Sequence, residues 1–243
     1  MIRIENTAVM NMDNAIRGMR NPMNSWDKSD SELVQCHNQD KCGSCPGDAE
    51  PLICEMMKKS GFVIVGENDL ALMHKLATAG SDHRKFLRQI MVSVDITAPL
   101  YWWKEFDTYK VGTVANSCST MHTIHKKEFE LDDFSHENLK MASRALLEEV
   151  IDELNLWRDR FINYDKYCKN VRDFKELNEK KECWWQMIQL LPSSYNQKRT
   201  VTLNYEVLLN QYHARKNHKL SEWHTYCDWI ESLPYFKEIC IEN

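Results

Sequence analysis

Residues 98–122 decide the fold and read APLYWWKEFDTYKVGTVANSCSTMH. The stretch begins with hydrophobic and aromatic residues and ends with small hydroxyl, amide and thiol residues. Its first half can be buried in a core, while its second half offers many hydrogen-bonding groups and little bulk. A buried element that leads into a polar loop is a common support for a ligand site. A helix followed by an ordinary turn has the same composition, so both interpretations are open.

The composition is that of a globular protein without a strong charge bias. The chain has 243 residues, 43% of them hydrophobic, and a net charge of −5. This length fits one large domain or two small ones. The acidic balance argues against general nucleic-acid binding. Residues 2–30 are too polar for a signal peptide, and no apolar run approaches the roughly 18 residues that cross a membrane. We therefore expect a cytoplasmic protein without membrane contact.

Nine cysteines are many for such a protein. Four of them follow the spacing C-x5-C-x2-C-x8-C, namely Cys36, Cys42, Cys45 and Cys54. Four soft ligands within twenty residues match a tetrahedral zinc site or an iron–sulfur centre. The spacing fits no standard pattern, so free thiols in a polar surface insertion are the alternative. The remaining five are expected to be reduced thiols: Cys118, Cys168, Cys183, Cys227 and Cys240.

Hydrophobic periodicity predicts a mostly helical chain with a modest sheet. Residues 136–163 have the pattern of an amphipathic helix with a charged, solvated face. The β-branched run at residues 91–96 favours a strand instead. The other expected elements are a strand at residues 2–4, helices at residues 11–20, 70–79, 100–109, 169–191, 201–215 and 219–231, and a polar loop at residues 113–120. No Ser-His-Asp set, P-loop, G-x-G-x-x-G or H-E-x-x-H motif can be recognised, so these patterns alone name no function.

Two segments near the middle of the chain carry recognisable motifs. The first is His83, followed by the expected strand and then by Ala98-Pro99 and a helix. The second reads T-Y-K-V-G-T at residues 108–113 and, after one inserted residue, A-N-S-C-S-T-M-H at residues 115–122. The spacing of the second segment parallels the pattern R-H-R-x-x-S-x-N-E-x-S-x-R-Y.

A third segment completes the series near the C-terminus. It has L-P at residues 191–192, followed by Asn204, Asn210 and Arg215 in the pattern L-P-x(n)-N-x5-N-x4-R. In this order, the three segments resemble the flavin-dependent thymidylate synthases, whose first motif is G-H-x-T-P-F-E-H followed by a strand and A-P. The resemblance covers roughly residues 80–225 and depends on order and spacing as much as on identity.

The departures from the family pattern remove several cations. The triplet R-H-R is T-Y-K at residues 108–110, the signature glutamate is Ser117, and the last signature arginine is Met121. The arginine that precedes L-P in the family falls near Trp185 and Ile188. Each lost guanidinium weakens the binding of a dianionic nucleotide, because forked arginine–phosphate bonds are charge-assisted. The chain resembles a divergent member, of the kind that phages carry.

The resemblance implies a fold, a reaction and partners. The fold is α+β, mainly helical with a small antiparallel sheet, in a single domain over residues 1–243 with a Cys-rich insertion at about residues 31–60. The reaction is methyl transfer that converts dUMP to dTMP. Methylenetetrahydrofolate supplies the carbon, reduced FAD passes a hydride, and NADPH reduces the flavin. The family forms homotetramers and uses no protein nucleophile, so no catalytic residue is expected.

The resemblance also implies roles for individual residues. Those expected to bind the substrate are Arg215, Ser119, Lys110, Glu105 and Asn116, with Arg215 on the phosphate or base and Lys110 as a phosphate cation. Those expected to border FAD and folate are His83, Asn204, Asn210 and Arg88. Singly, each of these residues also suits an ordinary structural role as a cap, turn former or surface charge.

A second function remains open at this point. The fold can persist after catalysis is lost, which would leave a nucleotide-binding or protein-interaction module with a cysteine-bound metal. Six tryptophans are compatible with subunit interfaces and equally with an ordinary core: Trp102, Trp103, Trp184, Trp185, Trp223 and Trp229.

Overall fold

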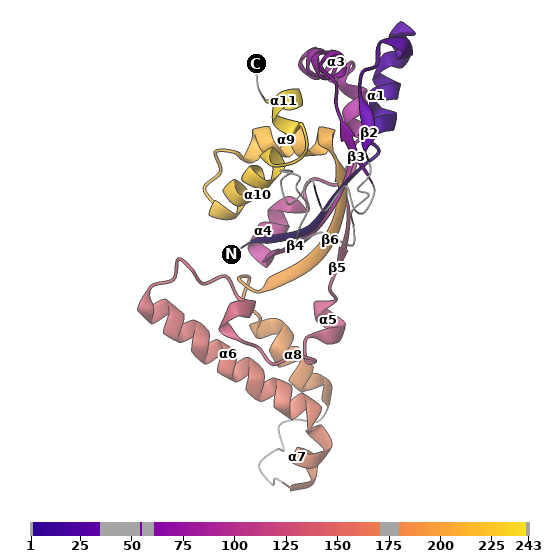
Figure 1. The fold of residues 1–243 in the computed structure, drawn as a ribbon. Helices are drawn as coiled ribbons and strands as arrows, with labels where there is room; N and C mark the ends of the chain where they lie inside the picture. The colour runs from indigo at the N-terminus through magenta and orange to yellow at the C-terminus, as the bar shows by residue number, and fades with distance from the viewer. Residues whose placement is uncertain (1, 35–53, 55–60, 171–179, 242–243) are drawn as a thin grey trace, which may run out of the picture. The chain divides into compact units, whose positions relative to one another are not determined.

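The computed structural model describes residues 2–34, 54, 61–170 and 180–241 (Figure 1). It is mainly helical with a small antiparallel sheet, which confirms the predicted α+β fold class. The chain forms two compact units. The first comprises Met1–Arg3, Thr97–Thr108 and Ser117–Arg199, and the second comprises Ile4–Ile96, Tyr109–Asn116 and Thr200–Asn243.

Two sheets are present in the described residues. The larger has the strand order β1-β4-β6-β5, formed by Arg3–Met10, Met91–Pro99, Asn196–Asn204 and Val114–Ser117 respectively. The smaller is the antiparallel ribbon of β2 (Glu32–Val34) and β3 (Phe62–Ile64). Between β4 and β6, the Thr200 hydroxyl donates to Asp95 at 2.6 Å, and the Thr202 hydroxyl lies 3.5 Å from that of Ser93. As the residue number rises from 200 to 202 along β6, that of its partner in β4 falls from 95 to 93, so the two strands are antiparallel.

The central strand β4 confirms the predicted strand and extends it to Pro99. Every second side chain from Val92 to Ala98 is buried, so one face of the strand lies in a core. The predicted helix after it is α4 (Leu100–Phe106), which is shorter than expected. Trp102 and Trp103 in α4 are fully buried, which makes them core residues.

The second unit holds most of the shorter helices. They are α1 (Met12–Arg20), η1 (Asn21–Met23), η2 (Trp26–Lys28), α3 (Glu67–Thr78), η4 (Arg84–Arg88), α9 (Tyr205–Arg215), α10 (Ser221–Glu231) and α11 (Phe236–Cys240). α1 places its buried residues Met12, Ala15, Ile16 and Met19 on one face, at the spacing of an amphipathic helix. The helices predicted at 11–20, 70–79 and 219–231 are therefore present, and α3 begins three residues earlier than expected.

A buried ion pair ties α1 to α3. Arg20 is 3% exposed and Asp69 is 0% exposed, and the Arg20 Nε donates to the Asp69 Oδ1 at 2.6 Å. The Ser29 and Ser31 hydroxyls donate to the other carboxylate oxygen at 2.7 and 2.6 Å. Burial alone would raise the pKa of Asp69. The hydrogen bonds from Ser31, Ser29 and Arg20 outweigh burial, so the pKa lies below its ordinary value.

The first unit is built around a pair of packed helices. Its helices are α4, α5 (Thr120–Thr123), η5 (Leu131–Asp133), α6 (Met141–Ile162), α7 (Tyr164–Asn170) and α8 (Lys180–Leu190). α6 packs against α8, and Phe129, Phe134, Leu154 and Met187 are among the buried residues of their shared core. The helix predicted at 136–163 thus begins at Met141. The part of the 169–191 prediction that falls on residues 171–179 lies outside the described residues.

Two predictions about element type are wrong. The helix expected at 201–215 begins at Tyr205, because the alternating run T-V-T-L at 200–203 belongs to strand β6. The expected polar loop at 113–120 contains strand β5 and the start of α5. The strand expected at residues 2–4 continues as β1 to Met10. Within the described ranges, no helix combines the length and apolar character needed to cross a membrane.

Candidate functional site

Helix α9 carries three of the predicted site residues. Asn204 precedes the helix as its N-cap, and its Oδ1 accepts a hydrogen bond from the Val207 N–H at 3.1 Å. Arg215 is the last helical residue, where a positive charge complements the helix dipole. Asn210 lies between them and is exposed. The motif N-x5-N-x4-R therefore spans one helix, about 16 Å from end to end.

The segment from Tyr109 to Gly112 lies against this helix at both ends. At one end, the Arg215 Nε donates to the Tyr109 hydroxyl at 2.8 Å. At the other end, Gly112 has a φ of 73°, and an added Cβ would lie 3.0 Å from the Val207 Cγ2 and 3.3 Å from the Asn204 Nδ2. Only glycine fits this close approach with a left-handed backbone. Lys110 lies between the two contacts and is exposed.

The aromatic rings of Trp223 and Tyr109 lie beside the Arg215 guanidinium. Its central carbon lies 4.7 Å from the Trp223 ring centroid and 5.5 Å from that of Tyr109. The two rings stand 6.3 Å apart at 72° to one another. Trp223 is fully buried, so it belongs to the core. Cation–π attraction therefore holds the arginine on both rings.

The short helix η4 packs against α9 and adds basic residues. The Arg84 Nε lies 2.9 Å from a Glu206 carboxylate oxygen, which joins the two helices. His83 directly precedes η4 and Arg88 ends it, and both are exposed. The structure thus brings all four predicted cofactor residues, His83, Arg88, Asn204 and Asn210, onto α9 and its neighbour.

The remaining predicted residues lie elsewhere in the fold. Asn116 is an exposed residue of β5 in the second unit. Glu105 and Ser119 belong to the first unit. The Ser119 hydroxyl caps α5 by accepting a hydrogen bond from the His122 N–H at 3.3 Å. The Glu105 carbonyl accepts one from the Thr108 hydroxyl at 2.7 Å.

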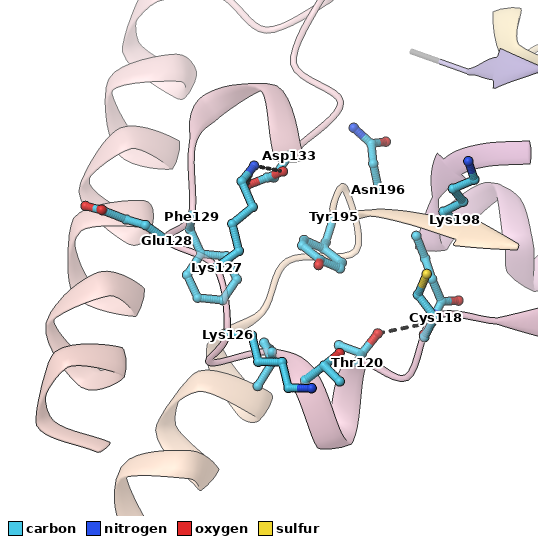
Figure 2. Close-up of a pocket in the computed structure, with 13 residues that line it drawn as sticks. Cys118, Thr120, Lys126, Lys127, Glu128, Phe129, Asp133, Tyr195, Asn196 and Lys198 are labelled. Atoms are coloured by element: carbon cyan, nitrogen blue, oxygen red, sulfur yellow. Dashed lines mark hydrogen bonds and ion pairs between the residues drawn. The ribbon is translucent and has the colours of Figure 1, made fainter. Parts of the chain in front are cut away.

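A pocket of about 360 Å³ lies in the first unit, beside the residues that flank Ser119 (Figure 2). Residues 118–133 and 195–198 supply its walls. Gln197 organises one side, because its Nε2 donates to the Cys118 carbonyl at 3.1 Å and to the Thr120 hydroxyl at 3.0 Å. Burial and the nearby charge of Asp133 raise the pKa of Tyr195. The phenol therefore stays protonated in this wall.

The charges of this pocket largely cancel. Figure 2 shows Lys127 reaching Asp133, with Nζ 3.0 Å from the carboxylate, and Glu130 lies 3.4 Å from the same amine. The hydrogen bond to Asp133 raises the pKa of Lys127, so the lysine is charged. Two further lysines, Lys126 and Lys198, and one acid, Glu128, complete the charged lining. The pocket carries little net charge, so we favour the surroundings of α9 as the candidate site.

Tyr109 and Trp223 were not among the site residues predicted from the sequence. Tyr109 stands at the second position of the triplet at residues 108–110, and this position in the signature is the one sequence feature that could have predicted a role in the site. Trp223 comes from another helix, and no local pattern connects it with Arg215.

The predicted metal site falls largely outside the described residues. Cys36, Cys42 and Cys45 lie outside them, and Cys54 is described. Across residues 2–34, 54, 61–170 and 180–241, no group of three or more His, Cys, Asp or Glu side chains is placed to hold a metal ion.

Comparison with known proteins identifies the fold. No protein-family model and no curated protein matches the sequence. Two solved structures of thymidylate synthase X (ThyX), the flavin-dependent enzyme from Helicobacter pylori, each with FAD and dUMP, do match. The first has a TM-score of 0.62 and 15% identity over 100% of this chain and 97% of that one. The second has a TM-score of 0.57 and 16% identity over 99% and 97%. The chain therefore has a ThyX-like fold along its whole length.

Proposed function

We propose that this chain is a flavin-dependent thymidylate synthase-like methyltransferase that converts dUMP, or a related pyrimidine nucleotide, to its methylated product. The observation that carries the proposal is the full-length match to ThyX structures solved with FAD and dUMP. The arrangement around α9 supports it, because residues expected from the sequence motifs to bind ligands gather there.

The chain's own residues would bind and orient the nucleotide. Arg215 offers a planar guanidinium for forked hydrogen bonds to base or phosphate oxygens. Lys110 is an exposed cation on the segment beside α9 and suits a phosphate. Asn116, an exposed residue of β5 in the same unit, is proposed as a further substrate contact. No protein nucleophile is needed, so orientation and electrostatics are the protein's contribution.

The residues around η4 fit the cofactor FAD. Its diphosphate needs cations and hydrogen-bond donors, and this turn presents Lys85 and Arg88 as exposed cations while Glu206 is paired with Arg84. Asn204, Asn210 and His83 add amide and imidazole groups. When bound, FAD supplies hydride transfer, with NADPH as the proposed reductant and methylenetetrahydrofolate as the proposed carbon donor.

We further propose a cytoplasmic homotetramer. Val111 and Val114 are 91% and 72% exposed, and neighbouring subunits would cover such apolar side chains. Sedimentation equilibrium distinguishes a tetramer of about 115 kDa, four times the 28.8 kDa chain, from a monomer.

The four clustered cysteines are proposed to bind zinc or an iron–sulfur centre. Elemental analysis of the purified chain and of the variant Cys42→Ser/Cys45→Ser tests this proposal separately from the enzyme assay. Metal in the first sample and its loss from the second are expected.

The enzyme proposal is tested on the full chain incubated with FAD. We expect flavin absorbance to remain with the protein after desalting. Adding dUMP, methylenetetrahydrofolate and NADPH should then yield dTMP, measured by chromatography. Arg215→Met should abolish most of the product, whereas Arg144→Met, at an exposed ion pair in α6, should not. Protein that retains no flavin and forms no dTMP would contradict the proposal.

A second candidate is a nucleotide-binding module without catalysis. Met121, at the place of the last signature arginine, is 54% exposed and offers no charge. The Thr108 hydroxyl, at the place of the first, donates to the Glu105 carbonyl. Binding of dUMP with no turnover in the assay above would favour this candidate.

A further inference from the structure

We infer that Tyr109 is a positioning residue that fixes the plane of the Arg215 guanidinium and so determines how tightly the chain binds a pyrimidine nucleotide. The inference deepens the proposed function and rests on it. The guanidinium would recognise a ligand that presents two oxygen acceptors in the guanidinium plane. Such a pair belongs either to the base with its carbonyls or to the phosphate group.

The contact geometry defines the orientation of the arginine. The hydrogen bond from the Arg215 Nε to the Tyr109 hydroxyl, at 2.8 Å, fixes one edge of the guanidinium. The central carbon lies over the Trp223 ring, 4.7 Å from its centroid, so the ring limits where the guanidinium can lie. The hydrogen bond and the ring contact together restrict the orientation of the guanidinium more than either contact does alone.

Trp223 provides a rigid support for this plane. Its ring is fully buried and makes edge contacts with Tyr226 at 5.5 Å and His218 at 6.2 Å. Tyr226 is itself fixed, because its hydroxyl donates to the Gln211 side chain at 2.7 Å in the interior. Arg215, by contrast, is partly exposed, so a ligand can reach it.

The segment that carries Tyr109 has a second contact with α9 besides Arg215. Three residues later, Gly112 adopts its left-handed conformation against Val207 and Asn204. Both ends of α9 therefore contact the same short segment, and the position of the Tyr109 hydroxyl depends on the helix that carries Arg215. The tyrosine and the arginine form one unit around α9.

The benefit of this arrangement is entropic. A free arginine samples many rotamers and loses that freedom when it binds a ligand. An arginine already held in one plane loses less, so the same hydrogen bonds give a higher affinity. Removing the phenol oxygen alone should therefore weaken nucleotide binding while leaving the fold intact.

The experiment is a titration of the FAD-incubated full chain with dUMP, followed by calorimetry. Tyr109→Phe keeps the ring and removes the hydroxyl, and it should weaken dUMP binding about 5-fold to 10-fold. Arg215→Lys loses the planar fork and should weaken binding at least as much. In the double variant, Tyr109→Phe should add almost nothing to the loss from Arg215→Lys, because the tyrosine acts through the arginine. Where turnover is measured, the KM for dUMP should rise and the KM for methylenetetrahydrofolate should not.

Controls separate positioning from general stability. Tyr235→Phe removes another tyrosine hydroxyl of the same unit, which accepts from the Val65 N–H at 3.1 Å, and should leave dUMP affinity unchanged. Tyr109→His keeps an aromatic ring but is too short to reach the Arg215 Nε, so it should lose affinity as Tyr109→Phe does. It replaces Tyr109→Phe if that variant folds poorly. Deoxyuridine compared with dUMP shows whether the acceptors belong to the base or the phosphate.

The outcomes distinguish this inference from the proposed function. If the unchanged chain binds no dUMP, the proposed function fails. If it binds dUMP and Tyr109→Phe binds equally well, the inference is overturned while the function stands. Fully additive losses in the double variant also overturn it.

Discussion

Arg20 and Arg215 each end a helix of the second unit, and they are held in different ways. Arg20 donates to the carboxylate of Asp69 and is 3% exposed, so solvent and ligands do not reach it. Arg215 donates to a phenol, lies against two aromatic rings and is partly exposed. A buried carboxylate makes an arginine part of the fold. Aromatic support holds an arginine in place while a ligand can still reach it.

Breaking the Arg20–Asp69 pair should have the largest effect on stability. Arg20→Met leaves a buried carboxylate without its cation and should lower the free energy of unfolding by about 3–5 kcal/mol. Arg215→Met should lower it by only about 1 kcal/mol, because the side chain is partly exposed. Urea unfolding at pH 7 measures both. The double variant Arg20→Met/Asp69→Asn removes the buried charge but keeps an oxygen acceptor for the Ser29 and Ser31 hydroxyls, so it should recover part of the loss. An Arg20→Met protein as stable as the parent would refute the structural role.

Acid should remove the contribution of Asp69 progressively. Because its pKa in the folded chain lies below the ordinary value of 3.8, the stabilisation is complete above the unfolded pKa and is lost as pH falls through the folded one. Urea unfolding of the parent and Asp69→Asn should therefore differ by a constant amount between pH 7 and about pH 5. The difference should shrink below about pH 4. A difference that grows on acidification would contradict the sign of this shift.

Gly112→Ala should test how firmly the segment beside Arg215 is placed. The left-handed backbone alone costs a non-glycine residue about 1–2 kcal/mol. The new Cβ would also lie 3.0 Å from the Val207 Cγ2. Gly80→Ala is the matched control, because Gly80 also has a positive φ but no atom within 4 Å of an added Cβ. Urea unfolding should show the larger loss for Gly112→Ala, and only this variant should lower dUMP affinity.

Arg144 gives the smallest expected effect among the three arginines. It pairs with Glu148 at 3.2 Å on the surface of α6, where both side chains are about half exposed. Arg144→Ala should lower the free energy of unfolding by about 0.3–0.5 kcal/mol, and high salt should reduce that difference. A loss comparable to that of Arg20→Met would mean that exposure does not govern the strength of these pairs.

Sequence patterns predicted the parts of the fold that local periodicity controls. The alternation in β4 and the helical spacing in α1 and α6 correspond to elements of the structure. These elements depend on neighbours in the chain, so they can be inferred without tertiary contacts. Asn204, Asn210 and Arg215 are singled out by the family resemblance, and they lie at the N-cap, within and at the end of α9.

The missed features depend on distant contacts or on a change of element. The T-V-T-L run alternates like a strand, but apolar α9 follows it without a break, and the two were merged into one helix. Tyr109 and Arg215 are 106 residues apart, so no local pattern could connect them. The Arg20–Asp69 pair is equally hidden, because each residue alone has the appearance of a surface charge on a helix.

The ribbon of β2 and β3 has a consequence for how this chain can change over evolutionary time. Val34 and Phe62 are paired across it, so these two positions lie side by side although 27 residues separate them in the sequence. Loop-closure entropy rises slowly with length, by about 0.6 kcal/mol for each doubling. A change in the number of residues between Val34 and Phe62 should therefore cost the ribbon little stability, provided that the two strands keep their register.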